Sequence, residues 1–187
     1  MVSPPFTPAK IRAAVRLALA AARTAGAQVA LTGGTALEAW GLARATHDVD
    51  LVFLLPPGRF GRFQHALRAQ GAQVLELRGD ARTAWLRVAV RGVQIDWLRA
   101  WDPPSQRALR RAVVRQVLGL RLKVLRPEDL ILLKLRVGRP RDLDDAVRLY
   151  AFCGPQLDRP YLRRGLRQLR LGREWAYLER SLRHLSF

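Results

Sequence analysis

The segment from Leu31 to Leu55 constrains the fold of this chain more than any other part; it reads LTGGTALEAWGLARATHDVDLVFLL. It joins a Gly-Gly pair to an Asp-x-Asp pair that opens an apolar, β-branched run. The pattern predicts a strand that ends at Thr32, a short helix over about 35–42, and a second strand that carries Asp48 and Asp50. Side chains at positions i and i+2 of a strand point to the same face, so the two carboxylates are expected side by side.

Paired carboxylates that face a glycine turn suit the binding of Mg²⁺ and phosphate, because Mg²⁺ prefers oxygen ligands. Gly33 and Gly34 lack a Cβ, which lets phosphate groups approach backbone N–H groups where a helix begins. A Gly-Gly pair alone is more often a plain turn. Between a strand and a helix, shortly before Asp-x-Asp, Gly33, Gly34 and Thr35 predict a cradle for a triphosphate. The chain contains neither GxxxxGK[ST] nor GxGxxG, which argues against P-loop and dinucleotide-binding folds.

A third carboxylate, Asp96, lies in a later apolar run. Residues 83–90 alternate in polarity and residues 93–98 return after a glycine, so the two runs predict a β-hairpin. If the strand of Asp96 lies beside that of Asp48 and Asp50, three carboxylates converge, which is costly unless cations neutralise them. Two Mg²⁺ ions would do so and would organise phosphoryl transfer, with Asp96 able to accept a proton. The alternative, unrelated surface carboxylates, is disfavoured because these strands are apolar.

Helical patterns flank these strands and fill the end of the chain. We expect helices over 7–26, 60–71, 127–137 and 142–152, and two amphipathic helices after residue 159. Pro103-Pro104 predicts a loop, and 120–125 a short strand. These patterns divide the chain into a core, 1–126, and a helical C-terminal region, 127–187, packed on it as one continuous domain.

The formal net charge is +18, with a pI near 11.7, and thirty of the 33 basic residues are arginine. A preference for arginine codons explains the excess of Arg over Lys but not the net charge. Such a field attracts polyanions, with RNA as the first candidate and an acidic protein as the second. Two stretches carry much of it, 105–126 and the tail after 159. Lys134 stands out, because a lysine retained in an arginine-rich chain indicates a need for a compact ammonium.

The sequence gives no sign of membrane insertion or secretion. No run of about 18 apolar residues is present, and the first residues lack the pattern of a signal peptide. Cys153 is alone in an apolar context and is expected to be a buried thiol, so no internal disulfide can form. A cytoplasmic location without membrane association is therefore expected.

The run GGTALEAWGLARATHDVDL resembles the signature of the DNA polymerase β-type nucleotidyltransferase superfamily. Within it, the run is similar to the minimal group that includes the AbiEii toxins of type IV toxin–antitoxin systems. That group shows a Gly-Gly turn and then Arg-x-Thr-x-Asp-x-Asp, here Arg44, Thr46, Asp48 and Asp50. It also shows a helix that bears a lysine followed by Arg-Asp-x-x-Asp, here Lys134, Arg141, Asp142 and Asp145. The resemblance covers about 28–150.

The resemblance implies an α/β (α+β) fold, a mixed β-sheet flanked by helices with a helical C-terminal part. It implies Asp48, Asp50 and Asp96 as catalytic carboxylates and metal ligands for two Mg²⁺ ions, with Mn²⁺ as a substitute. It implies an NTP donor such as ATP, release of pyrophosphate, and transfer of a nucleotide to an acceptor. Lys134 is implied as a triphosphate contact, since an ammonium on an apolar helix face needs an anion; the alternative is a lysine that extends to solvent.

Several neighbouring residues have more than one interpretation. Arg44 either contacts phosphate or orients the loop before Asp48, and His47 in the same loop is expected to be solvated. Asp142 and Asp145 are expected to cap a helix and to pair with Arg139 or Arg141 rather than to act in catalysis. Trp97 is expected in the core rather than in a base pocket.

Together these features predict an Mg²⁺-dependent nucleotidyltransferase whose acceptor is RNA, tRNA in particular. The sequence leaves two roles open: a toxin-like enzyme with an acidic protein antitoxin as partner, or a housekeeping enzyme. An aminoglycoside acceptor is polycationic and needs an acidic pocket, which the +18 charge disfavours; a protein hydroxyl acceptor stays open. A non-catalytic nucleic-acid-binding member of the fold would be indicated by a missing carboxylate, and all three are present.

Overall fold

The structure is a computed structural model, and it describes residues 7–43 and 48–185 of the 187-residue chain. The chain separates into two units by its internal contacts. The sheet unit comprises Met1–Ala39 and Ala43–Leu125, and the helical unit comprises Trp40–Leu42 and Arg126–Phe187. The expected division into a core, 1–126, and a C-terminal region within one continuous domain stays a prediction. Each unit is described by itself below.

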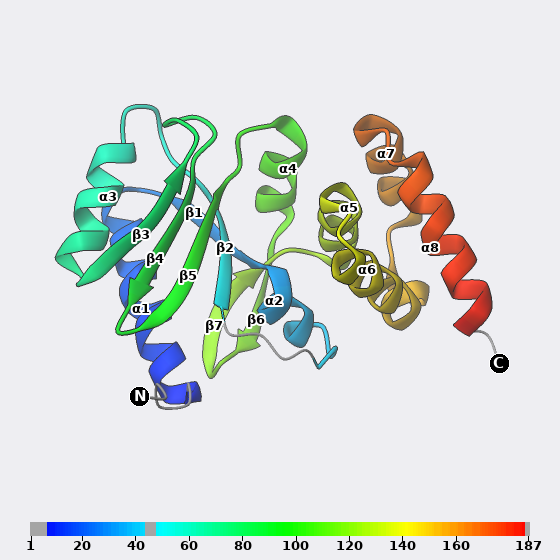
Figure 1. Ribbon diagram of the computed structural model, residues 1–187, viewed down its shortest axis with the longest axis horizontal. Coiled ribbons are helices and arrows are strands. Elements are labelled where there is room, and N and C mark those ends of the chain that lie inside the picture. Colours follow the sequence, from blue (N-terminus) through cyan, green and yellow to red (C-terminus); the bar gives the residue numbers. More distant parts are fainter. Residues whose placement is uncertain (1–6, 44–47, 186–187) are drawn as a thin grey trace. The chain divides into compact units, whose positions relative to one another are not determined.

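In its described residues the sheet unit contains one seven-stranded sheet with the strand order β3-β4-β5-β2-β1-β7-β6 (Figure 1). The strands are β1 (Gln28–Thr32), β2 (Asp48–Leu54), β3 (Ala72–Arg78), β4 (Trp85–Val90), β5 (Val93–Arg99), β6 (Val113–Val117) and β7 (Leu120–Val124). The β2–β5 and β1–β7 pairs are parallel, and the other neighbours are antiparallel. The mixed sheet and the β4–β5 hairpin expected from the sequence are confirmed.

Helices cover both faces of this sheet (Figure 1). One face packs against α1 (Pro8–Thr24) and α3 (Phe60–Ala69), and α2 (Gly33–Ala39) and α4 (Pro103–Arg111) lie over β1 and β2 on the other. The alternation of β2 sorts its side chains between these faces. Val49, Leu51 and Phe53 enter the core with α1 and α3, and the two aspartates point to the opposite face. The apolar alternation thus decides where the carboxylates lie.

Three aromatic side chains form the centre of the core between the sheet and α3. Phe53, Phe63 and Trp97 are fully buried, and their ring centroids lie 4.9–5.7 Å apart in stacked and edge-to-face arrangements. Such pairs contribute about 0.5–1.5 kcal/mol each beyond the burial of their area. The core interpretation of Trp97 is therefore confirmed.

Helix α1 begins where the sequence predicts, whereas another helix begins where the sequence predicted a loop. Thr7 caps α1, with its hydroxyl accepting from the Lys10 N–H at 3.3 Å. The predicted loop at Pro103-Pro104 is wrong, because these prolines open α4. Asp102 is the N-cap and accepts from the Ser105 N–H at 2.9 Å, which completes a capping box. Proline is compatible with the first helical turn because its missing N–H would have no partner there.

Two further elements differ from the expectation. The short helix α2 begins at Gly33 and ends at Ala39, so it is shifted toward the glycines relative to the expected 35–42. Strand β6 was not expected at all; it pairs with β7 in an antiparallel hairpin. Its burial pattern is mostly exposed, and a strand at the edge of a sheet needs little apolar alternation.

The helical unit contains α5 (Pro127–Val137), α6 (Pro140–Cys153), the 3₁₀ turn Gly154–Gln156, α7 (Arg159–Leu169) and α8 (Gly172–Leu185). Helix α5 packs against α6 and α7, and α6 against α8. Gly165 of α7 lies so close to Leu132 of α5 that a Cβ would overlap it, which explains glycine at this helix crossing. Cys153 is a buried thiol outside any disulfide, as expected. None of the described helices is long and apolar enough to cross a membrane.

The aromatic cluster yields a stability prediction. Phe63→Ala should lower the free energy of unfolding by about 3–5 kcal/mol, because it removes a fully buried aromatic side chain and leaves a cavity. Urea denaturation followed by circular dichroism measures this. Leu75→Ala on β3 is the control, since Leu75 is 50% exposed and should lose much less. Equal losses in the two variants would show that the cluster is not the centre of the core.

Candidate active site

The three aspartates predicted to form the site converge on one face of the sheet. Strands β2 and β5 pair in parallel with Asp50 directly opposite Asp96, and Asp48 lies two residues earlier on β2. One carboxylate oxygen from each of the three lies within 4.8 Å of the others. The adjacency on which the sequence argument depended is therefore present.

Local sequence explains why these side chains share a face. On β2, Val49 and Leu51 alternate with the two aspartates and are buried in the core. On β5, Ile95 and Trp97 flank Asp96 and are fully buried on the same side. Since successive side chains of a strand alternate between faces, burial of these apolar residues directs all three aspartates to the opposite face.

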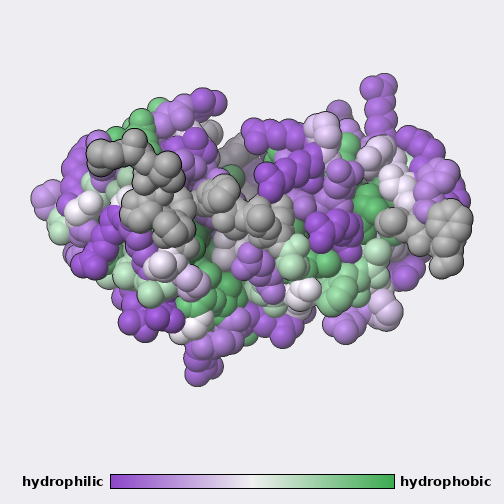
Figure 2. All heavy atoms as spheres, turned by 60° about the horizontal axis from the view of Figure 1, so that its bottom comes forward, coloured by the Kyte–Doolittle hydropathy of each residue, from purple (hydrophilic) through white to green (hydrophobic). Residues whose placement is uncertain are grey.

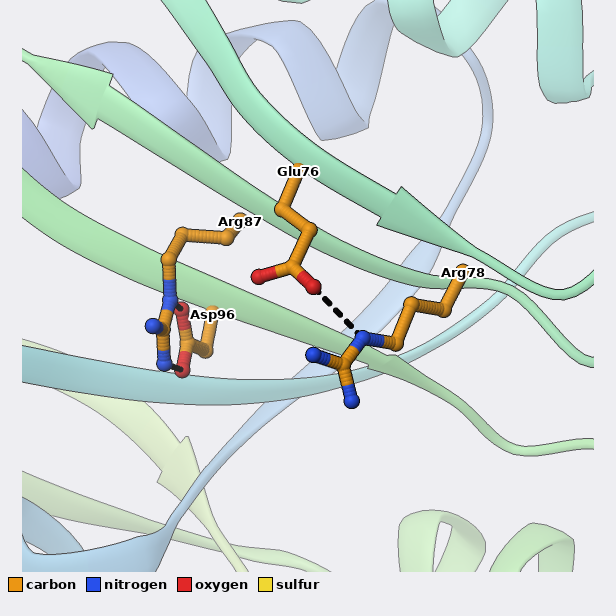
Figure 3. Close-up of polar contacts among 4 residues, drawn as sticks. All are labelled: Glu76, Arg78, Arg87 and Asp96. Atoms are coloured by element: carbon orange, nitrogen blue, oxygen red, sulfur yellow. Dashed lines mark hydrogen bonds and ion pairs between the residues drawn. The ribbon is translucent and has the colours of Figure 1, made fainter.

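A basic residue that the sequence argument did not select, Arg87 of β4, binds the third carboxylate. Its Nε and one terminal nitrogen donate to the two oxygens of Asp96 at 2.8 and 2.7 Å, in a bidentate pair (Figure 3). Asp96 is 4% exposed, so this partner offsets much of the cost of its burial. The hydrogen bonds with Asp96 raise the pKa of the Arg87 guanidinium above its usual value.

The signal for Arg87 was present in the hairpin. Val90 pairs with Val93 across the Arg91-Gly92 turn, and counting back from that pair places Arg87 opposite Asp96. Both central residues of the turn have positive φ, the conformation of a two-residue hairpin turn that fixes the register. Register therefore identifies the partner of the third carboxylate, although composition does not.

Beyond Arg87, the same face of the sheet carries further charged and aromatic side chains. Glu76 of β3 pairs with Arg87 in the strand register, and its carboxylate accepts from Nε of Arg78 at 2.5 Å (Figure 3). Trp85 of β4 lies beside both arginines. The guanidinium carbons of Arg78 and Arg87 are 5.3 and 4.9 Å from the centroid of its ring. The carboxylate cluster thus borders an arginine–tryptophan surface.

On the other side of the carboxylates lies the predicted phosphate turn. Gly33 has φ +64, and a Cβ there would overlap the carboxylate of Asp50. The Thr35 hydroxyl donates to the carbonyl of Asp48 at 3.4 Å, which links the start of α2 to the start of β2. Gly34 and Thr35 are buried. The glycine turn and the Asp-x-Asp pair are therefore in direct contact, and a nucleotide-binding role of Gly33, Gly34 and Thr35 stays a prediction.

Lys134 lies in the helical unit, on α5, and is 8% exposed. Its ammonium donates to carboxylate oxygens of Asp142 at 2.6 Å and Asp145 at 2.9 Å, both on α6. The expected anion is thus supplied by these aspartates, and the lysine does not extend to solvent. Contact of Lys134 with a triphosphate stays a prediction, and Arg44 lies outside the described residues.

The three aspartates have the composition of a divalent cation site. Together with Arg87 they carry a net charge of minus two when these four side chains alone are counted. One oxygen from each carboxylate lies within 4.8 Å of the others, close enough for the three side chains to share divalent ions. The donor set, oxygens only, is the one that Mg²⁺ and Mn²⁺ prefer.

Comparison with known proteins agrees with this geometry. Residues 17–184 match the model of a family described as "Nucleotidyl transferase AbiEii toxin, Type IV TA system". The chain belongs to this AbiEii nucleotidyltransferase family. It is a nucleotidyltransferase, as the sequence predicted. A comparison with curated proteins found no match.

Solved structures share the fold of this AbiEii family member. The solution structure of the antibiotic-resistance factor ANT(2'')-Ia matches with a TM-score of 0.61 and 18% identity, covering 95% of this chain and 100% of that one. The crystal structure of ANT(2'')-Ia with adenylyl-2''-tobramycin matches with a TM-score of 0.55 and 18% identity, covering 83% and 94%. At these identities the likeness establishes the fold, and the predicted fold class is confirmed.

The close approach of Gly33 and Asp50 yields a prediction. Gly33→Ala should weaken Mn²⁺ binding at least about tenfold, because the added Cβ displaces the Asp50 carboxylate. About tenfold is the lower end of the loss expected when a metal ligand is no longer held in position. Isothermal titration with Mn²⁺ measures this. Gly58→Ala is a matched control, since Gly58 has φ +72 but no atom within 4 Å of an added Cβ. It shares the backbone strain without the overlap. If both variants bind Mn²⁺ alike, the approach of Gly33 to Asp50 has no role in metal binding.

Proposed function

We propose that this nucleotidyltransferase uses Mg²⁺ to transfer a nucleotide from an NTP to RNA. One observation carries the proposal: Asp48, Asp50 and Asp96 converge beside a glycine turn in a member of the AbiEii family. The acceptor, the ion and a toxin role are parts of the proposal. Each is supported by the chemistry of described residues, as follows.

The three aspartates are proposed to hold the divalent ions, which when bound neutralise the phosphates and lower the pKa of the acceptor hydroxyl. In the reaction, the acceptor oxygen bonds to the α-phosphorus of the NTP. The bond from that phosphorus to the β-phosphate oxygen breaks, and pyrophosphate leaves. Asp96 is proposed to accept the proton of the acceptor hydroxyl, and Arg87 to orient its carboxylate.

The donor phosphates are assigned to the glycine turn. Gly33 brings the backbone to the edge of the Asp50 carboxylate with no side chain between them. Backbone N–H groups near Gly33 and Gly34 can then meet phosphate oxygens close to the ions. Arg44 and Lys134 are proposed as further phosphate contacts, on the basis of the family pattern alone.

RNA is favoured as acceptor by charge. The net charge is +18, and positive charge is also concentrated on single helices. On α7, Arg163, Arg164 and Arg167 are exposed while Leu162 and Leu166 are buried. Figure 2 shows hydrophilic side chains over much of the face in view. Phosphate binding by such arginines releases counterions, so the affinity for RNA should fall steeply with salt.

An aminoglycoside acceptor is the alternative suggested by the likeness to ANT(2'')-Ia, whose complex contains adenylyl-2''-tobramycin. A polycationic acceptor needs carboxylates around it. Here the surface next to Asp96 carries Arg78 and Arg87, and Arg87 already occupies both oxygens of that aspartate. The two guanidinium groups therefore disfavour an aminoglycoside amine on this side of the site.

The toxin role follows from the family description, and the basic surface suits an acidic antitoxin as partner. Whether activity harms a cell depends on the acceptor. The RNA acceptor and the toxin role are therefore tested with the same two proteins, wild type and Asp50→Ala.

Incubation with each α-labelled NTP, Mg²⁺ and total RNA or tRNA should transfer label to RNA. Asp50→Ala should abolish the transfer, because it removes a carboxylate from the cluster. Glu179→Ala is the control, since it removes an exposed carboxylate of α8. The label is resolved on a gel, which separates RNA from protein products, and tobramycin replaces RNA in a parallel reaction. Label on tobramycin or protein alone would contradict the RNA acceptor.

The toxin role is tested in cells. Expression of wild type, but not of Asp50→Ala, should arrest growth.

The Lys134 assignment has its own test. Lys134→Met should lower the free energy of unfolding by about 3–5 kcal/mol, because Asp142 and Asp145 lose a buried partner. If Lys134 also contacts the triphosphate, NTP binding to the folded variant should weaken by about 1–3 kcal/mol. Lys123→Met, which replaces an exposed lysine of β7, is the control for both measurements. A loss of stability with unchanged NTP affinity would restrict Lys134 to a structural role.

A further inference from the structure

A row of cross-strand neighbours divides the site into two sides. Across the sheet, the register places Thr32 opposite Asp50, Asp50 opposite Asp96, Asp96 opposite Arg87, and Arg87 opposite Glu76. The glycine turn continues from Thr32, at one end of this row. If the donor phosphates lie on that turn, the acceptor must approach the reacting phosphorus from the opposite end, over β4 and β3.

At that opposite end the sheet carries Trp85. It lies two residues from Arg87 on β4, so both side chains are on the same face, and it is partly exposed. Its cross-strand neighbours are Arg78 on β3 and Leu98 on β5. Leu98 is 38% exposed, and the side chain of Arg78 is 73% exposed. An indole with an apolar neighbour and an accessible guanidinium thus borders the carboxylates.

The two arginines beside Trp85 differ in their freedom. Arg87 is held by both oxygens of Asp96, so it gives the indole a fixed neighbour. Arg78 is bound to Glu76 by an exposed ion pair, and exposed pairs of this kind contribute little to stability. A base that takes the place of Arg78 over the indole would leave this guanidinium free for the adjacent phosphate.

We propose that Trp85 is the stacking site for the terminal base of a single-stranded RNA acceptor, with Arg78 as the contact of the neighbouring phosphate. This inference rests on the proposed transfer to RNA and specifies where and in what form the acceptor binds. Indole stacking combined with arginine–phosphate contact is how proteins bind single strands without reading their sequence. A base within a duplex has its faces covered by neighbouring bases, so an unpaired end is required.

The test is the affinity of a short fluorescein-labelled single-stranded RNA, measured by anisotropy without NTP. Trp85→Ala should weaken binding about tenfold, as for loss of one stacking platform, and Trp85→Phe should keep most of the affinity. Arg78→Ala should weaken binding and reduce its salt dependence. Arg62→Ala, which removes one exposed arginine from α3 beyond the opposite face of the sheet, should bind as wild type. Circular dichroism verifies that each variant is folded, and NTP affinity is measured in parallel.

The outcomes separate this inference from the proposed function. If wild type labels RNA but Trp85→Ala binds RNA as well as wild type does, the stacking site is overturned and the transfer to RNA stands. If Trp85→Ala weakens NTP binding and not RNA binding, the indole serves the donor base and the inference is likewise overturned. If Trp85→Ala loses RNA affinity while wild type labels no RNA, the RNA site is supported and the proposed transfer fails.

Discussion

The parallel pairing of β2 with β5 is the constraint on which the whole site depends, because it sets Asp50 beside Asp96. Two neighbouring carboxylates repel each other, so some other contribution must hold this register. It comes from the opposite face, where Leu51 and Trp97 pair across the same two strands and are buried. Full burial of such a side chain stabilises by about 1.5–3 kcal/mol. A slip of one residue would turn the aspartates into the core, which makes the register strongly specified.

Arg87 reduces the repulsion between the carboxylates but does not remove it. Its planar guanidinium matches both oxygens of Asp96, a geometry that the single ammonium of lysine cannot reproduce. One guanidinium among three carboxylates leaves an excess of negative charge on this face. The cluster is thus partly neutralised without a metal ion, and the remaining negative charge suits the divalent cations proposed to bind there. The same partner orients the most buried of the three aspartates, the one proposed to accept the proton.

Sequence reasoning reached those parts of the site that depend on alternation and on short spacing. The shared face of Asp48 and Asp50, the hairpin and the core position of Trp97 all follow from a period of two. The same alternation would have identified Arg87, but this residue was considered only as part of the net charge. The partners of Lys134 could not be identified in this way. Asp142 and Asp145 reach it across the turn at Gly138, and helical periodicity does not fix the packing of α5 on α6. The prolines at 103–104 were misread because a proline pair occurs in loops and in first helical turns alike.

Net charge and local arrangement answer different questions about the acceptor. A charge of +18 indicates that the binding partner is a polyanion, but it does not indicate where on the protein the polyanion binds. The strand register adds a direction, since it orders the glycine turn, the carboxylates and the Trp85 surface in one line. Arg87 lies at the junction, bound to Asp96 and beside the indole of Trp85. A base in the place of Arg78 would therefore stack on an indole that also contacts Arg87, the side chain that orients Asp96, which couples acceptor binding to the geometry of the reacting groups.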